Sequence, residues 1–278
     1  MKKYIFISLF CNAILFFGCE PVTNSDIEFD PEPLTLINGF ISPENDIISI
    51  EVFRTASIFD QQEPLREDLV ISNAIVTLTN ENQETIILPF NELELHYEIS
   101  SNDFSVEPGK QYDLKVIVGQ NEYLATTLVP ENTIESISAE KITVDNSAEV
   151  QFTYLKVEFR DIPNIRNTYI VGAETFDGFS TREVFFEDNK FITDTNLNND
   201  LLSVTSFLPS ISNNDLEVEV VILNMQPIVF QLIRALEFND FNNGDPFSQP
   251  IVPPNNIEGD GGYGVFGSYR VTTETFRL

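Results

Sequence analysis

The sequence predicts a mainly β protein: an antiparallel β-sandwich over residues 34–130, then a second β-rich domain over residues 131–278 with one helix near residues 227–238. Three observations support this fold class. Apolar and polar residues alternate along many short segments, which is the period-two pattern of half-buried strands. Turn-forming residues separate these segments at the spacing typical of a sandwich. A single segment shows the 3.6-residue period of an amphipathic helix.

The alternation is clear in the N-terminal half. Ile48, Ile50 and Val52 share one face of a segment, and Ser49 and Glu51 share the other face. Because successive side chains of a strand point to opposite sides, the apolar face of this segment is predicted to be buried. By the same criterion we expect strands at residues 34–37, 48–52, 74–79, 112–118 and 122–129.

A local motif narrows the type of sandwich. Pro108 and Gly109 stand just before Tyr112, which opens an alternating strand. This order resembles the tyrosine corner of immunoglobulin- and fibronectin-like sandwiches, in which the tyrosine hydroxyl bonds to the main chain upstream. We therefore expect an immunoglobulin/fibronectin-like fold in this half, with a structural role for Tyr112.

The C-terminal half follows a boundary near residues 130–133. The apolar positions change parity between Tyr154 and Leu155, which predicts a β-bulge there. Strands are expected at residues 150–159, 168–176, 183–186, 201–208, 215–224 and 265–276.

The predicted helix begins at Pro227, whose missing N–H is not needed in a first helical turn. Apolar residues follow at the spacing of one helix face: Val229, Leu232, Ile233 and Leu236. We expect this face to pack against the core, and a partner surface is the alternative.

Residues 1–18 have the features of a secretory signal peptide, because Lys2 and Lys3 precede a mostly apolar run that ends at Gly18. Cys19, directly after this small residue, resembles the lipobox cysteine of bacterial lipoproteins, which receives the lipid and becomes the first residue. We predict lipidation of Cys19; the alternative is an ordinary signal peptide followed by a chance cysteine. A transmembrane anchor is disfavoured because the run is shorter than the ~20 apolar residues that span a bilayer.

Residues 19–33 are polar, acidic and proline-containing, and we expect them to form the lipidated tether. Removal of residues 1–18 takes the formal net charge from −29 to −31, because it removes Lys2 and Lys3 and no acidic residue. So acidic a chain repels nucleic-acid phosphates and anionic lipid headgroups. Nucleic-acid binding is therefore excluded, and the lipid itself is the expected membrane contact.

Residue types that support catalysis are scarce. Cys11 and Cys19 are the only cysteines, and His96 is the only histidine. One histidine cannot form a histidine-rich zinc site, and it lacks a recognisable triad partner. No nucleophile elbow or phosphate-binding loop is present. Carboxylate pairs arise by chance among 44 acidic residues, so they do not argue for glycoside hydrolysis. We expect a protein that is not an enzyme.

Two acidic loops are candidate calcium sites, and no other cofactor is expected. The first places oxygen ligands on alternate residues, as at the start of an EF-hand loop: Asp194, Asn196, Asn198 and Asp200. It lacks the glycine and the final glutamate of that motif. The second, weaker candidate consists of Asp240, Asn242 and Asp245. The alternative for both is a polar turn, since Asn and Asp bond readily to their own backbone.

The glycine-rich segment 259–264 has two interpretations. One is a loop whose backbone passes close to another surface. The other is a phosphate-binding nest, which suits so acidic a chain poorly. We favour the first, and we predict a contact with a partner or ligand through Gly259, Gly261, Gly262, Tyr263 and Phe266.

Several blocks spread over nearly the whole chain support a family resemblance. They lie at residues 37–43, 72–78, 108–112, 230–236, 245–250, 256–259 and 261–267, the last with the pattern Gly-Gly-x-Gly-x-Phe. Together they resemble a Bacteroidota outer-membrane lipoprotein family that carries a domain-of-unknown-function label; Asp260 and Tyr263 depart from its pattern. The resemblance implies an outer-membrane lipoprotein, often encoded beside TonB-dependent receptors. It implies no enzymatic activity and no ligand.

We therefore expect a non-enzymatic, membrane-anchored lipoprotein that serves as an accessory or binding partner of a TonB-dependent outer-membrane transporter in nutrient uptake. The alternative is a stand-alone surface module that binds or adheres to a glycan, a polymer or a cation. A hydrolase is a third and weaker reading. The expected location is the outer membrane, on either its periplasmic or its cell-surface face.

Overall fold

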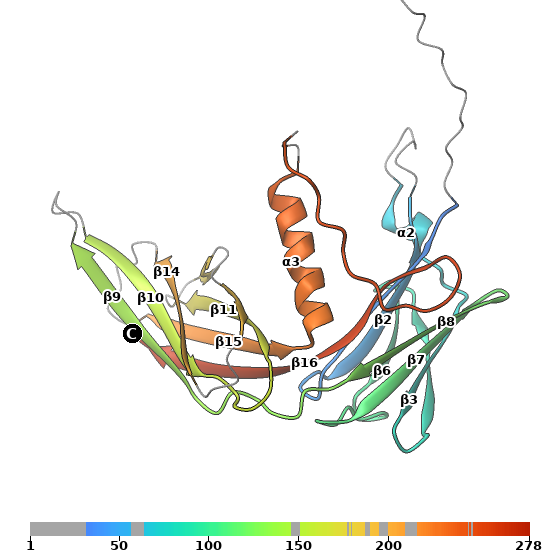
Figure 1. The fold of residues 1–278 in the computed structure, drawn as a ribbon, viewed down its shortest axis with the longest axis horizontal. Helices are drawn as coiled ribbons and strands as arrows, with labels where there is room; N and C mark the ends of the chain where they lie inside the picture. The colour runs from blue at the N-terminus through green and yellow to red at the C-terminus, as the bar shows by residue number, and fades with distance from the viewer. Residues whose placement is uncertain are drawn as a thin grey trace, which may run out of the picture. The chain divides into compact units, whose positions relative to one another are not determined.

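The computed structural model describes residues 32–56, 64–145, 151–176, 178, 180–186, 190–194, 200–208, 216–243, 245 and 247–278. Residues 33–278 form one compact unit. This described part is mainly β, with several antiparallel sheets and one long helix, as the sequence predicts (Figure 1).

Two facing sheets form the N-terminal sandwich. The first contains, in spatial order, β1 (Thr35–Ile41), β2 (Ile47–Arg54), β6 (His96–Ser100) and β5 (Phe90–Asn91). The second contains β4 (Thr85–Leu88), β3 (Ile75–Asn80), β7 (Gln111–Val118) and β8 (Asn121–Leu128). The short helix α2 (Arg66–Leu69) lies between β2 and β3 along the chain. The alternation predicts β1, β2, β3, β7 and β8, but it does not predict the shorter β4, β5 and β6.

The core of this sandwich is formed by one face of each strand. Ile48, Ile50 and Val52 have no exposed surface, as their alternation predicts. Tyr112 is also buried: its hydroxyl accepts a hydrogen bond from the Glu107 N–H at 2.8 Å and donates to the Ser105 carbonyl at 3.1 Å. The predicted tyrosine corner is therefore confirmed.

Strand β16 (Gly262–Arg277) joins the sandwich to the C-terminal half. From Gly262 to Ser268 it pairs in parallel with β1, and from Tyr269 onward it pairs antiparallel with β15 (Glu217–Met225). The same sheet continues through β11 (Thr168–Phe176) to β12 (Thr181–Glu183), and β13 (Phe191–Thr193) also pairs with β11. One sheet thus contains strands from both halves, and a domain division near residue 130 stays a prediction.

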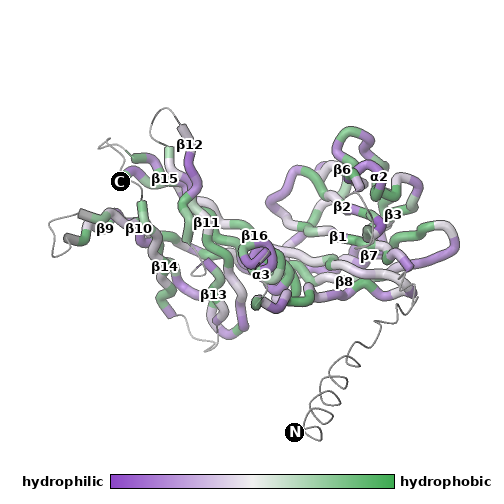
Figure 2. Tube along the Cα trace, turned by 90° about the horizontal axis from the view of Figure 1, so that it is seen from above, coloured by the Kyte–Doolittle hydropathy of each residue, from purple (hydrophilic) through white to green (hydrophobic). Residues whose placement is uncertain are grey.

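In the C-terminal half, the sheet that contains β16, β15 and β11 is covered on both faces. One face packs against a sheet that contains, in order, β14 (Leu201–Leu208), β10 (Gln151–Arg160) and β9 (Ile137–Asp145). The other face packs against α3 (Pro227–Phe241), which is seen end-on beside β16 in Figure 2. The pleat of β11 shows both contacts, because Tyr169 and Val171 belong to the first core and Ile170 belongs to the core beneath α3.

The predicted β-bulge in β10 is wrong. This strand pairs with β9 and β14 without a skipped residue. The change of parity arises because both faces of the strand carry apolar side chains. Leu155 is buried in the core, whereas the rings of Phe152 and Tyr154 contact the half-exposed Phe207.

Helix α3 begins at Pro227, as predicted, and ends at Phe241 rather than near residue 238. Its buried face is shifted from the predicted stripe, since Leu236 is half exposed. The buried residues of the helix are Val229, Phe230, Leu232 and Ala235.

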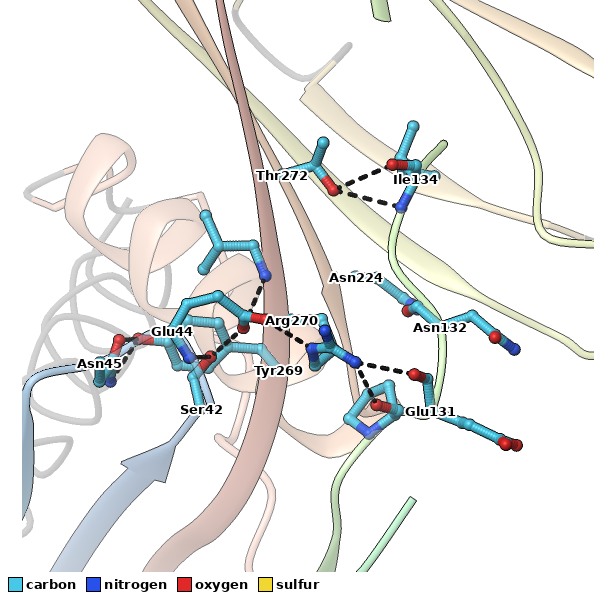
Figure 3. A network of polar contacts seen from close by, with 12 residues as sticks. Ser42, Glu44, Asn45, Glu131, Asn132, Ile134, Asn224, Tyr269, Arg270 and Thr272 are labelled. Atoms are coloured by element: carbon cyan, nitrogen blue, oxygen red, sulfur yellow. Dashed lines mark hydrogen bonds and ion pairs between the residues drawn. The ribbon is translucent and has the colours of Figure 1, made fainter. Parts of the chain in front are cut away.

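The segment after β8 is fastened to β16 by polar side chains (Figure 3). Arg270 donates to the Glu131 carbonyl and to the Glu44 carboxylate, each at 2.7 Å. The Thr272 hydroxyl accepts a hydrogen bond from the Ile134 N–H at 3.2 Å. Because Glu44 lies in the turn between β1 and β2, Arg270 joins that turn, β16 and the connection between the two halves.

Candidate functional site

The predicted lipidation site, Cys19, lies outside the described residues, as does most of the predicted tether. Within the part of the chain that the structure describes, we find no helix with the length and hydropathy needed to cross a membrane.

The glycine-rich segment packs against β8, the edge strand of its sheet. Glu258 exchanges two main-chain hydrogen bonds with Leu124, at 2.8 and 2.9 Å. Gly259 has a φ of +130°, and a methyl group at this position would lie 2.5 Å from the Glu122 carbonyl oxygen. A glycine is required for so close an approach of two backbones. The segment therefore covers the edge of the N-terminal sandwich.

The residues predicted for a partner contact differ in their exposure. Gly262 is the first residue of β16, and Gly261 is the exposed residue directly before it. Tyr263 is half-buried, and its hydroxyl donates to the Pro253 carbonyl at 2.5 Å. Phe266 has no exposed surface and belongs to the N-terminal core. We therefore leave Phe266 out of any proposed contact surface.

The first predicted calcium loop has its two ends beside a third acidic residue. Asp194 follows β13 and Asp200 precedes β14, whereas Asn196 and Asn198 lie outside the described residues. The Asp161 N–H donates to the Asp200 carbonyl at 2.9 Å. Among the described residues, no group of three or more His, Cys, Asp or Glu side chains is arranged to hold a metal ion.

The end of α3 and the loop after it expose large apolar side chains. We call this surface the α3 tip and define it by Phe238, Phe241, Phe247, Ile251 and Val252. Phe241, Phe247 and Val252 are 84, 93 and 80% exposed. Single exposed apolar residues are ordinary, but a group of them that includes aromatic rings is typical of an interaction site.

Polar side chains hold the loop of the α3 tip in place. The Asn239 amide bonds to both the N–H and the carbonyl of Ile251, each at 2.8 Å. Asp245 Oδ1 accepts the Phe247 N–H at 2.9 Å, and the Asn242 amide donates to the Phe238 carbonyl at 2.7 Å. Asn242 and Asp245 of the second predicted calcium loop thus bond to the main chain of their own turn, as a polar turn requires.

Sequence reasoning missed the α3 tip because it stopped the helix too early. One feature of the sequence could have revealed this surface. Phe241 and Phe247 stand on either side of a polar run, which would otherwise be an ordinary surface turn. Beside that run the loop forms a hollow of about 490 Å³, lined by Asn239, Asp240, Asn242, Asn243, Asp245, Ser248 and Pro250.

His96 lies on β6 and forms an edge pair with Glu98. Its Nε2 lies 2.6 Å from Glu98 Oε2, and the Asn91 amide donates to the same carboxylate at 2.9 Å. Hydrogen bonds from Asn91 and then His96 hold the pKa of Glu98 below its usual value. A hollow of about 470 Å³ beside this pair is lined in part by Phe90 and Ile99, so it offers both polar and apolar contacts.

Comparisons with known proteins place the chain in a family. Among curated proteins, none matches the sequence. A solved structure described as "Biofilm associated protein - BSP domain" aligns at 9% identity with a TM-score of 0.18, over 88% of this chain and 59% of that chain. This chain therefore spans less than two thirds of that chain's length. The family model for "Domain of unknown function (DUF4249)" matches residues 21–275, which is most of the sequence. The chain belongs to the DUF4249 family.

Proposed function

We propose that this protein is a non-enzymatic lipoprotein, anchored to a bacterial outer membrane through Cys19, whose α3 tip binds a membrane-protein partner. The partner that we propose is a TonB-dependent transporter engaged in nutrient uptake, and the resemblance to Bacteroidota lipoproteins supports this choice. The observation that carries the docking part of the proposal is the exposed aromatic surface of the α3 tip.

The proposed tether keeps the folded body near the membrane. Residues 20–31 separate Cys19 from the start of the described chain. Extended fully, about 12 residues span at most roughly 43 Å, since each residue adds about 3.3–3.6 Å. A partner embedded in the same membrane is therefore within reach of the body.

The charge of the chain favours a protein partner over a lipid surface. The formal net charge of −29 opposes approach to anionic headgroups, and the predicted removal of Lys2 and Lys3 makes the body more acidic still. Aromatic side chains are enriched in protein interfaces, where they often dominate the binding energy. Phe241 and Phe247 are the residues of the α3 tip that we expect to contribute most.

The alternative function is a stand-alone surface module that binds a glycan or another polymer. The hollow beside His96 and Glu98 favours it, because polar groups there lie next to the ring of Phe90. Glycan binding by the protein without any membrane partner would support this alternative.

Site-specific photo-crosslinking in native cells tests the docking surface. A photoreactive phenylalanine analogue replaces Phe247 in one variant and, as a matched control, Leu93, which is 91% exposed in the N-terminal half. We expect an adduct with one outer-membrane transporter from position 247 and no such adduct from position 93. The same adducts from both positions, or only lipid adducts from position 247, would contradict the proposal.

A further inference from the structure

Helix α3 ends without the basic residue that usually balances the negative end of a helix dipole. The C-terminal end of a helix carries a partial negative charge, so lysine and arginine are favoured in its last turn. The last turn of α3 contains neither, and the exposed Asp240 stands there instead. Asn242 and Asn243 donate to the last carbonyls of the helix, but these donors are neutral. Two negative charges therefore lie together at the α3 tip.

Basic residues are missing from a long stretch of sequence around the α3 tip. No lysine or arginine lies between Arg234 and Arg270. Arg234 itself stands six residues before Asp240, which is about 9 Å along a helix axis and beyond the last turn. The same stretch contains five acidic residues: Glu237, Asp240, Asp245, Glu258 and Asp260. Within the described chain, only Glu237 of these five has an ion pair, with Lys190 at 2.7 Å.

The two acids nearest the exposed rings line one hollow. Asp240 and Asp245 both face the hollow of about 490 Å³ beside the α3 tip. Asp245 Oδ1 accepts the Phe247 N–H at 2.9 Å, so the turn holds this carboxyl group next to an exposed ring. Phe241, which is also exposed, directly follows Asp240. Carboxylates bind guanidinium and ammonium groups by charge-assisted hydrogen bonds, and aromatic rings attract the same groups.

We propose that the α3 tip binds a basic segment of its partner, with an arginine or lysine side chain in the hollow and apolar side chains beside Phe241 and Phe247. This inference rests on the proposed docking at the α3 tip and adds the chemistry of the partner's surface. Charge complementarity selects this occupant. A second copy of the chain would bring the same acids and be repelled, as would anionic lipid headgroups.

The proposal predicts opposite effects on binding and on stability. A carboxylate at the C-terminal end of a helix is unfavourable in the free protein, so Asp240→Asn should not destabilise it. Asp245→Asn keeps an oxygen that can accept the Phe247 N–H, so the turn should also persist. The matched control is Asp103→Asn, which removes one charge from an exposed acid in the N-terminal half. A residue with a purely structural role would instead lose stability when it is changed.

Photo-crosslinking of the full chain in native cells, with the photoreactive phenylalanine analogue at position 247, tests the proposal. We expect the yield of the transporter adduct to fall roughly fivefold or more when Asp240→Asn and Asp245→Asn are combined. The yield should stay within about twofold in the control Asp103→Asn, because a distant exposed charge contributes little. Sequencing of the crosslinked partner peptide should find a lysine or arginine close to the attachment point. The urea midpoint of the double variant should be unchanged or raised.

The outcomes separate this inference from the docking on which it rests. A transporter adduct whose yield is the same in the double variant would overturn the basic partner and leave the docking itself standing. An equal fall in Asp103→Asn would also overturn it, because the effect would then come from net charge. So would a fall in yield together with a lowered urea midpoint, which would give the two acids a structural role. The absence of a transporter adduct from the otherwise unmodified protein would overturn the docking proposal and this inference together.

Discussion

In each half of the molecule, the hydroxyl of a buried tyrosine forms hydrogen bonds with a turn and holds it in place, but the two tyrosines have different partners. In the N-terminal half, the Tyr112 hydroxyl bonds only to main-chain groups, the N–H of Glu107 and the carbonyl of Ser105. In the C-terminal half, the Tyr169 hydroxyl accepts the Ile162 N–H and donates to the Asp161 carboxylate. Both hydroxyls reach back to the turn that precedes their strand.

The difference lies in what remains unsatisfied. The partners of the Tyr112 hydroxyl are neutral main-chain groups, and its hydrogen bonds to them leave no charged group in this corner. The Tyr169 corner ends in a carboxylate whose second oxygen lacks a hydrogen-bond partner within the described chain. Burial, and after it the hydrogen bond to Asp161, raises the pKa of Tyr169, so this hydroxyl stays protonated and keeps donating. The N-terminal corner therefore bonds only neutral groups, whereas the C-terminal corner holds an acidic group whose pKa is raised, first of all by burial.

The largest expected loss of stability comes from a substitution where β16 pairs with β1, the contact that links the two halves. Gly264 lies where β16 pairs with β1; its φ is +131°, and a methyl group there would lie 2.0 Å from the Ile37 carbonyl oxygen. Gly264→Ala should cost more than about 3 kcal/mol, because backbone strain adds to a backbone clash. Chemical denaturation measures the loss.

The matched control for that change is Gly119→Ala. Gly119 also has a positive φ, +62°, but no atom lies within 4 Å of the added methyl. We expect a loss of about 1 kcal/mol from backbone conformation alone. Equal losses at both glycines would show that the β1–β16 contact does not determine the stability of the sandwich.

The next effect compares the two tyrosines directly. Tyr112→Phe removes a hydroxyl from main-chain partners and should cost about 1–2 kcal/mol. Tyr169→Phe removes the donor to a buried carboxyl group and should cost about 2–3 kcal/mol, since hydrogen bonds to acidic groups contribute more and the loss leaves both carboxyl oxygens without this donor. Urea midpoints measure both losses. A smaller loss for Tyr169→Phe than for Tyr112→Phe would contradict the contrast between the two corners.

Much of this contrast could be predicted from sequence, and the failures have physical causes. The motif around Tyr112 is local, so Pro108 and Gly109 were enough to predict the corner. The Tyr169 corner is just as local, because its partners Asp161 and Ile162 lie a few residues upstream, but no Pro-Gly turn precedes Tyr169 to signal it. Segments with clean alternation, such as the strand at 201–208, are found with the predicted bounds. Short edge strands such as β5, of two residues, leave too few positions for a period to show.

The partner of β16 could not be predicted for a related reason. Alternation indicates that residues 265–276 form a strand, but it does not say which strand lies beside it. The parallel pairing with β1 joins residues more than 220 positions apart, such as Thr35 and Gly262. The α3 tip was missed because the predicted helix ended near residue 238, before Phe241, and because Phe247, Ile251 and Val252 lie in a loop that carries no periodic signal.

A smaller effect concerns the junction in Figure 3. Arg270→Met removes the bonds to Glu44 and to the Glu131 carbonyl while it keeps most of the apolar stem of the side chain. We expect a loss of about 1–2 kcal/mol, because these are partly buried, charge-assisted bonds. Equilibrium unfolding followed by both tyrosine fluorescence and far-ultraviolet circular dichroism should remain one transition. No loss of stability would show that the junction does not hold the halves together.

The smallest effect is at His96. Its hydrogen bond helps to hold the pKa of Glu98 down, so this carboxylate adds stability above its unfolded pKa and loses that contribution as pH falls through the folded pKa. His96→Gln should therefore raise the pKa of Glu98 and cost less than about 0.5 kcal/mol at neutral pH, with a smaller cost in acid. Titration of the Glu98 carboxyl by NMR checks the direction. If His96→Gln lowered the free energy of unfolding by more than about 1 kcal/mol, His96 would have a larger structural role than its hydrogen bond to Glu98.

The central claim is that a lipid on Cys19 ties this acidic β body to a membrane. Mass spectrometry of the N-terminal peptide from the native protein tests it most directly. We predict a peptide that begins at Cys19 and carries the mass of a diacylglyceryl group. An unmodified Cys19, or a peptide that begins at another residue in a protein that fractionates entirely with soluble material, would contradict the claim.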